Sequence, residues 1–304
     1  MLNYIYLLLI PIIFLVGLIG NITGLFVIKR KRLKKIGPRN IYLYLFCMDT
    51  MYLIQIIMPF LLFAFNIDMS TFNQFSCKLY QYLNYSLDTQ SSMLLVYISF
   101  ERLILIKYPT RVRILRKNNI QFVYFLTVFI YNLIYYLPIP FYYKLKTTIV
   151  NNTTTTTTTN NNNNKSTEYV LYCTFISLNS QLILGNMDLI NRVLIPLILM
   201  IAFSSVLINH IYKSRLRIFN NNNNNDLTRQ YNRNNRCFQR DLKFAITSIS
   251  LNLFYVLFNL PISIAVFFPN YYLYFTYPTF LILFYFSYTI NFYIIILMLH
   301  HFNY

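Results

Sequence analysis

The sequence predicts an all-α membrane protein, a bundle of seven transmembrane helices with its N-terminus outside and its C-terminus inside. Three observations carry this prediction. The 61 residues that follow Lys243 contain no Asp, Glu, Lys or Arg and are dense in Phe, Tyr, Ile and Leu. Seven apolar runs, each long enough to cross a bilayer as a helix, divide the chain. Clusters of basic residues lie at alternate ends of successive runs, as in loops that stay in the cytoplasm.

We expect one domain, residues 1–304, and one helix for each apolar run. The expected helices lie at about 4–28, 41–65, 77–106, 119–143, 189–213, 239–268 and 272–299. A helix of about 25 residues is about 37 Å long, which crosses the hydrocarbon layer with some tilt. Pro269 and Pro278 divide the charge-free C-terminal stretch into its two spans.

The net charge of +18 belongs to loops and does not indicate binding to nucleic acid. Most of the 26 Lys and Arg lie in three clusters, at Lys29–Arg39, Arg102–Lys117 and Lys213–Lys243. The positive-inside rule places these clusters in the cytoplasm and therefore places the N-terminus outside. An odd number of crossings puts the C-terminus inside, so the lipid bilayer is the expected surrounding of the protein.

Two low-complexity tracts are expected to be disordered, because neither has apolar side chains to bury. Residues 151–164, with a run of Thr, lie in the second outside loop, and residues 220–225 lie in the third inside loop. The outer tract carries glycosylation sequons at Asn151, Asn152 and Asn164. Runs of Asn also produce such sequons by chance.

The four cysteines are sorted by side of the membrane. Cys77 and Cys173 face the outside, whereas Cys47 and Cys237 lie toward the inside. A disulfide between the two outer cysteines would hold the second outside loop over the mouth of the bundle. The alternative is two free thiols.

Four helices bring polar side chains to about the same depth, which is unusual because polar groups in lipid are costly. Counted along each helix at 1.5 Å per residue, Asn21, Asp49, Ser91 and Asn291 lie about 12 to 16 Å above the inner ends. Ser287, one turn above Asn291, can join them. Oxygen atoms around a carboxylate suit a small cation or water. The alternative is interhelical hydrogen bonding that only holds the bundle together.

Several short patterns occur in order on the expected sides of the membrane. They are Gly20-Asn21, Leu45 to Asp49, Cys77 placed 25 residues before Arg102, Glu101-Arg102 followed by Pro109, Pro196, Pro261 and Asn291. Together they resemble the motifs of the rhodopsin-like G-protein-coupled receptors, and the resemblance covers all seven helices. It implies a plasma-membrane receptor that passes the signal of an extracellular ligand to a heterotrimeric G protein.

The resemblance also implies roles for individual residues. Arg102 would pair with Glu101 and with Asp241 at the start of helix 6, and breaking this clasp would let helix 6 swing outward. The alternative for Asp241 is a favourable acid in the first turn of a helix. Asp49, Ser91 and Asn291 would form the sodium site that stabilises the resting state. Sodium would act there as an allosteric ion, and no cofactor is expected.

The chain departs from the family at four functional positions. Asn259 stands where the family has a Trp two residues before Pro261, and Ser204 stands for a Tyr in helix 5. In helix 7, Asn291 is followed by Phe292, where the family has Pro, and Ile295 takes the place of Tyr. An Asn-Phe pair here resembles invertebrate neuropeptide receptors of the FMRFamide type.

The expected ligand pocket contains charges, which should face the bundle interior. Asn84 stands where amine receptors have an Asp, so an amine ligand is not expected. Asp88, one turn deeper, would receive a ligand Arg or Lys, and Arg192 would receive a carboxylate. The alternative is that Arg192 is neutralised by Asp188 or Asp88. The expected ligand is a short, basic, amidated peptide.

Other functions have less support. The three histidines, His210, His300 and His301, all lie at the inner face, so no catalytic pair or metal cluster is expected in the membrane core and the protein is not an enzyme. A transporter would show an internal repeat, and the sequence has none that we detect. The third possibility is a chemosensory seven-helix receptor that does not couple to a G protein.

Overall fold

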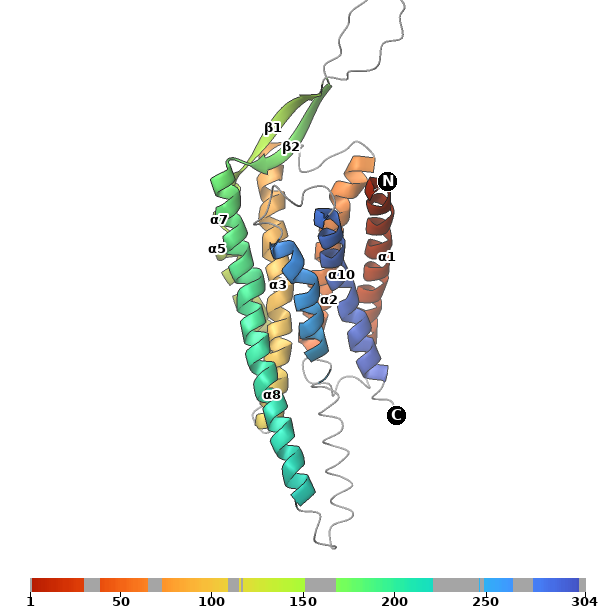
Figure 1. The fold of residues 1–304 in the computed structure, drawn as a ribbon, viewed down its shortest axis with the longest axis vertical. Helices are drawn as coiled ribbons and strands as arrows, with labels where there is room; N and C mark the ends of the chain where they lie inside the picture. Colours follow the sequence, from red (N-terminus) through yellow and green to blue (C-terminus); the bar gives the residue numbers. More distant parts are fainter. Residues whose placement is uncertain are drawn as a thin grey trace, which may run out of the picture.

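The computed structural model describes residues 2–29, 39–64, 73–108, 115, 117–150, 168–220, 246, 249–264 and 276–300. Within these residues seven long helices form a bundle (Figure 1). The first four are α1 (Leu2–Lys29), α2 (Arg39–Ala64), α3 (Gln74–Lys107) and α5 (Asn118–Tyr135). The fifth is one continuous rod made of α7 (Leu178–Asp188), η3 (Leu189–Leu194) and α8 (Ile195–Asn220). The sixth is the helix Ile249–Ile264, called helix 6, and the seventh is α10 (Thr276–His300). The start of α1 and the end of α10 lie at opposite ends of the bundle.

The predicted class, an all-α membrane bundle, is confirmed. Five helices of the described residues are long and apolar enough to span a bilayer. Their outward faces carry large apolar side chains such as Ile19, 63% exposed, and Phe26, 70% exposed. Charged and amide groups such as Asp49 and Arg102 are instead buried between helices. Apolar groups outside and polar groups inside are what a lipid surrounding selects.

Helix α3 is the central helix of the bundle and is 34 residues long. It contacts α2, α5, η3, α8 and the outer hairpin. Its first turn is closed by a capping box, in which the side chain of Asn73 accepts a hydrogen bond from the backbone N–H of Ser76. Asp88, Glu101 and Arg102 are all buried along it. Because α3 touches most of the other helices, charges on it can act on several of them.

Outside the membrane helices the structure forms a two-stranded sheet. β1 (Tyr143–Val150) and β2 (Glu168–Phe175) pair antiparallel, with Tyr143 opposite Phe175. This hairpin lies at the end of the bundle where α1 begins (Figure 1). The charge pattern assigns that end to the outside, so the hairpin belongs to the second outside loop.

Two helix boundaries differ from those expected from hydropathy. The run 119–143 is not one helix, because α5 ends at Tyr135 and a turn leads into the short helix α6 (Ile139–Tyr142). Pro138 and Pro140 explain this break, since proline lacks the N–H that a helix needs. The fifth rod begins at Leu178, well before residue 189, because Ser177 caps it with Ser180.

Some predictions fall on residues outside the described part of the chain. These are the tract 151–164 with Asn151, Asn152 and Asn164, residues 221–225 of the inner Asn tract, Pro109, Cys237 and Asp241. Asn220, the first residue of the inner tract, is the last residue of α8.

Candidate functional site

Three of the polar residues expected at one depth meet at a single carboxylate. Asp49 on α2 is fully buried. The Ser91 hydroxyl on α3 donates to Asp49 Oδ1 at 2.5 Å, and Asn291 Nδ2 on α10 donates to Asp49 Oδ2 at 2.9 Å. Both oxygens therefore have a donor, which offsets part of the cost of burying the group. The carboxylate links α2, α3 and α10.

Two other members of the expected layer bind elsewhere. Asn21 Nδ2 donates to the backbone carbonyl of Tyr288 at 3.4 Å, so it links α1 to α10 and does not reach Asp49. The Ser287 hydroxyl donates to the carbonyl of Phe284 in its own helix at 2.7 Å. Depth along a helix was sufficient to group three residues, but the rotation of each helix decides which side chains meet.

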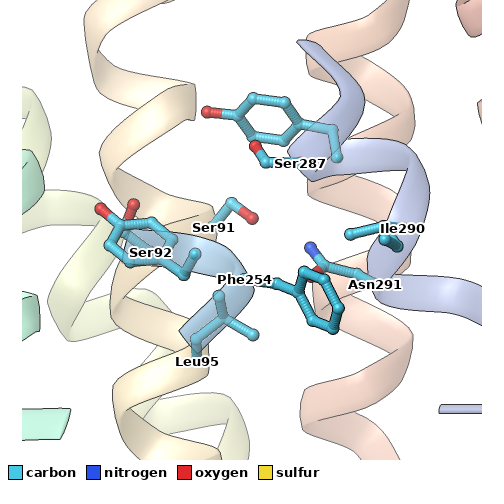
Figure 2. A pocket seen from close by; sticks show the side chains of 9 residues that line it. Ser91, Ser92, Leu95, Phe254, Ser287, Ile290 and Asn291 are labelled. Atoms are coloured by element: carbon cyan, nitrogen blue, oxygen red, sulfur yellow. The ribbon is translucent and has the colours of Figure 1, made fainter. Parts of the chain in front are cut away.

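A small cavity of about 10 Å³ is lined by Ser91 and Asn291, the two residues that donate to Asp49 (Figure 2). Its lining comes from α3, the helix Ile249–Ile264 and α10, and consists of Ser91, Ser92, Leu95, Phe254, Tyr255, Ser287, Tyr288, Ile290 and Asn291. In Figure 2 the Ser91 hydroxyl and the Asn291 amide point into the space between α3 and α10, with the ring of Phe254 below them. This volume suits about one water molecule.

A second charged cluster is centred on Arg192, in η3. Its Nη2 lies 2.7 Å from Asp188 Oδ2, one turn earlier, and its Nη1 lies 2.9 Å from Asp88 Oδ2 on α3. All three side chains are buried. The hydroxyl of Tyr288 also donates to Asp88 Oδ1. Of the two interpretations of Arg192, the structure shows the one in which acids of the chain neutralise it.

The backbone around Arg192 departs from a regular α-helix for a local reason. Residues Leu189–Leu194 form a π-helical turn just before Pro196. Proline has no N–H, so Pro196 gives no hydrogen bond to the carbonyl of Arg192, four residues earlier. The hydroxyl of Tyr255, from the helix Ile249–Ile264, donates to this carbonyl. Residue 196 thus cannot supply the α-helical hydrogen bond to this carbonyl, and a tyrosine of another helix donates to it.

Two amides of the expected pocket lie at the edge of this cluster. Asn84 is half-buried on α3, one turn nearer the outside than Asp88. Asn259 is buried, and its Nδ2 donates to the carbonyl of Tyr255 at 2.9 Å. Within the described part of the chain, Asn259 Oδ1 has no hydrogen-bond partner.

The inner end of α3 carries the expected acid–arginine pair. Glu101 and Arg102 are buried, with Arg102 Nη1 lying 3.8 Å from Glu101 Oε2. Arg102 Nη2 also donates to the hydroxyl of Tyr42 on α2 at 3.0 Å. Above them, Asn252 accepts from Ser99 and donates to Ser204, both at 3.1 Å. This amide joins the helix Ile249–Ile264 to α3 and α8.

The predicted disulfide is confirmed. Cys77 at the top of α3 is bonded to Cys173 in β2, with their Cα atoms 5.6 Å apart. Gln74 adds a second attachment, because its Oε1 accepts from the backbone N–H of Leu145 at 2.8 Å and its Nε2 donates to the carbonyl of Tyr143 at 3.4 Å. Both strands of the hairpin are therefore fixed to α3.

Tyrosines are the functional residues that the sequence did not reveal. Tyr42, Tyr255 and Tyr288 each bond to a charged or backbone group of the two sites, yet they are three of 29 tyrosines in the chain. One signal was available for the helix Ile249–Ile264. Tyr255, Asn259 and Ser263 recur every fourth residue, which places them on one face of a helix.

A bundle with charged groups on its inner faces and apolar groups on its outward faces has the architecture of a multi-pass membrane protein. Residues 20–296 match the family model described as 7 transmembrane receptor (rhodopsin family), and the chain belongs to that family. It is accordingly a receptor and not an enzyme. No curated protein matches the chain as a relative.

Proposed function

We propose that this receptor binds a short, basic, amidated peptide from outside and activates a heterotrimeric G protein inside, at the plasma membrane. One observation carries the proposal: α3 holds a buried charged group at each of two levels, Asp88 and Arg102. They are 14 residues apart, or about 21 Å along the helix. A shift of α3 against its neighbours would therefore change both sites together.

The charge of the outer cluster favours a ligand with a cationic group. Asp88 and Asp188 carry two formal negative charges and Arg192 one positive charge, so the cluster has one negative charge in excess. A guanidinium or ammonium of a peptide would complement it. Asn84 replaces the acid of amine receptors, and the Asn-Phe pair of helix 7 resembles FMRFamide-type receptors. Both features favour a peptide over a small amine.

The inner end supports coupling through Arg102. Arg102 contacts Glu101 at the inner end of α3 and Tyr42 at the inner end of α2. We propose that Asp241 at the start of helix 6 completes this clasp in the resting state. Outward movement of helix 6 would then expose Arg102 to a helix of the G protein.

We also propose that Asp49 holds a sodium ion in the resting state. The donor set fits a small hard cation, because the Ser91 hydroxyl lines a cavity and contacts the Asp49 carboxylate, so both can offer oxygen ligands. Ser287, which lines the same cavity, offers a third oxygen. The ion would supply the positive charge that the buried carboxylate lacks, and Asn291 would turn its amide oxygen toward it.

A ligand screen tests the proposed function. Cells that express the full chain with reporters for several G-protein classes would be exposed to amidated peptides, amines, nucleotides and lipids. We expect a response to a basic peptide. Asp88→Ala should abolish the response by preventing peptide binding, and Arg102→Ala should abolish it by preventing activation of the G protein. A response only to amines, nucleotides or lipids, unchanged in Asp88→Ala, would remove the peptide proposal.

The same cells test the remaining expectations. Labelling of intact cells reports the plasma membrane, and a mobility shift after glycosidase treatment reports glycosylation. The triple variant Asn151→Gln, Asn152→Gln, Asn164→Gln should lack that shift. A shift that persists in the variant would place the glycans elsewhere.

The second candidate is a receptor that binds a ligand without coupling. Ser204, Asn259 and Ile295 stand at positions where the family has aromatic residues for its active state. Moreover, Asn252 fastens helix Ile249–Ile264 to Ser204 on α8. Ligand binding without nucleotide exchange in any G-protein class would favour this candidate.

A further inference from the structure

Arg192 is the residue that touches the most helices at the outer charged cluster. It pairs with Asp188 on its own rod and with Asp88 on α3. Its Nη2 donates to the Ser263 hydroxyl on the helix Ile249–Ile264 at 3.1 Å. Its guanidinium also lies 4.8 Å from the ring centre of Phe284 on α10. One side chain thus connects four of the helices that must move against each other.

The two acids that hold Arg192 are not equivalent. Asp188 precedes Arg192 by four residues in the same rod, so the two move together. Asp88 belongs to α3, so the Arg192–Asp88 pair is a tie between two helices. The bond to Ser263 is likewise a tie, to the helix Ile249–Ile264. The contacts of the guanidinium with Asp88 and Ser263 therefore restrain movement between helices, whereas the contact with Asp188 does not.

Breaking a buried ion pair is normally costly because it leaves a charge without a partner. Here Arg192 keeps Asp188 when it leaves Asp88. Asp88 in turn keeps the hydroxyl of Tyr288 as a hydrogen-bond donor. Each side retains one partner, so the cluster can adopt a second arrangement without an isolated buried cation.

We propose that Arg192 is a two-position latch. When it is bound to both acids it ties α3, the helix Ile249–Ile264 and α10 to η3 and holds the resting state. When it is held by Asp188 alone it releases α3 and the helix Ile249–Ile264, which can then move outward at its inner end. The released Asp88 receives the cationic group of the ligand, a step that rests on the proposed function.

The latch makes an asymmetric prediction for two equivalent substitutions. Asp88→Asn weakens the tie to α3, because it removes the negative charge of residue 88, and it leaves the Arg192–Asp188 ion pair intact. The outward position of the helix Ile249–Ile264 therefore gains population. Asp188→Asn leaves Arg192 with Asp88 alone, so the tie is kept and the outward position loses population. A cluster that only stabilises the fold would respond to both substitutions in the same direction.

The test measures helix position in the purified full chain in lipid nanodiscs, with neither ligand nor G protein present. Cys47 and Cys237 are replaced by Ser, and nitroxide labels are placed at Lys107 and Ile246, which are both exposed. Pulsed electron–electron double resonance then gives the distribution of distances between the label on α3 and the label at the inner end of helix 6. We expect the long-distance population relative to the short one to rise about tenfold in Asp88→Asn. In Asp188→Asn it should fall below that of the parent chain.

Folding is checked in each variant by surface expression and by formation of the Cys77–Cys173 disulfide. Ser263→Ala is the second variant, because it removes the hydrogen bond of Arg192 to the helix Ile249–Ile264 and leaves both ion pairs. It also removes the bond from the Ser263 hydroxyl to the Asn259 carbonyl, which lies within that same helix and ties it to no other. It should raise the long-distance population by about fivefold. This variant decides the question if Asp88→Asn does not fold.

Two results would overturn the latch. The first is a shift of the same sign and size in Asp88→Asn and Asp188→Asn. The second is an unchanged distance distribution in both Ser263→Ala and Asp88→Asn. If Asp88→Asn does not fold, an unchanged distribution in Ser263→Ala is sufficient. The proposed function is tested independently of the latch. If the distances shift as expected but no G-protein reporter responds to any ligand, the latch stands and the coupling proposal fails.

Discussion

The hydroxyl of Tyr255 donates to the backbone carbonyl of Arg192, which lies four residues before Pro196, a residue with no N–H to donate. Both groups are buried, and they belong to two different helices. This hydrogen bond therefore helps to fix the rotation of the helix Ile249–Ile264 relative to the π-helical turn of η3. This contact also keeps Arg192 in place for its two acids.

Tyr255→Phe is expected to lower stability, because it removes the hydroxyl that donates to a buried carbonyl, at a cost of about 1–3 kcal/mol. The thermal midpoint of the purified receptor, followed by a thiol-reactive dye, measures the loss. Tyr212→Phe is the matched control, since the ring of Tyr212 is 62% exposed on α8. In a Pro196→Ala background, where residue 196 has an N–H, the same substitution should cost less. Equal losses in both backgrounds would contradict the account of the proline.

Tyr42→Phe is expected to raise ligand-independent nucleotide exchange. The Tyr42 hydroxyl accepts from Arg102 in the resting arrangement, so its removal weakens that state by about 1 kcal/mol, or about fivefold in population. Exchange in membranes with added G protein measures the effect. Tyr44→Phe is the control, because the Tyr44 ring packs on Phe125 at 4.6 Å and Phe keeps that contact. Unchanged exchange in Tyr42→Phe would mean that Tyr42 does not restrain Arg102.

The fold could be predicted from the sequence because a bilayer imposes a simple requirement on every span. Each helix needs about 20 apolar residues, and basic residues mark the inner side. The outer hairpin was not predicted, because Tyr143–Val150 follows an apolar run directly and its strand pairing depends on Glu168–Phe175, beyond the Thr and Asn tract. Pairing between distant segments leaves little local pattern.

The candidate site could be predicted only in part, for a geometric reason. Depth follows from counting residues along a helix, and it grouped Asp49 with Ser91 and Asn291. The rotation of a helix depends on packing against its neighbours, so nothing in the sequence showed that Asn21 would turn to Tyr288. Nor could composition distinguish functional tyrosines in a chain with so many of them.

Sodium is expected to stabilise the receptor through Asp49. If the ion binds the folded state, the stabilisation grows with concentration and reaches about 2.7 kcal/mol at 100 times the dissociation constant. The thermal midpoint should therefore rise with sodium chloride and stay constant with choline chloride at equal ionic strength. In Asp49→Asn the two salts should act alike, because the carboxylate is gone. A sodium-specific rise that survives in Asp49→Asn would place the ion at another site.

Gly24→Ala is expected to destabilise the packing of α1. A Cβ at Gly24 would lie 2.6 Å from Phe46 Cε2 and 2.9 Å from Phe292 Cδ2, so two aromatic rings must shift. Overpacking costs about 1–3 kcal/mol, more than the roughly 0.5–1 kcal/mol that Ala gains over Gly in a helix. The thermal midpoint should therefore fall, and Phe46→Leu in the same chain should restore part of it. Gly185→Ala, at a half-buried position in α7, is the matched control and should leave the midpoint unchanged or higher. If Gly24→Ala also raised the midpoint, helix propensity would outweigh the contact, and α1 would pack less tightly on α2 and α10 than these distances indicate.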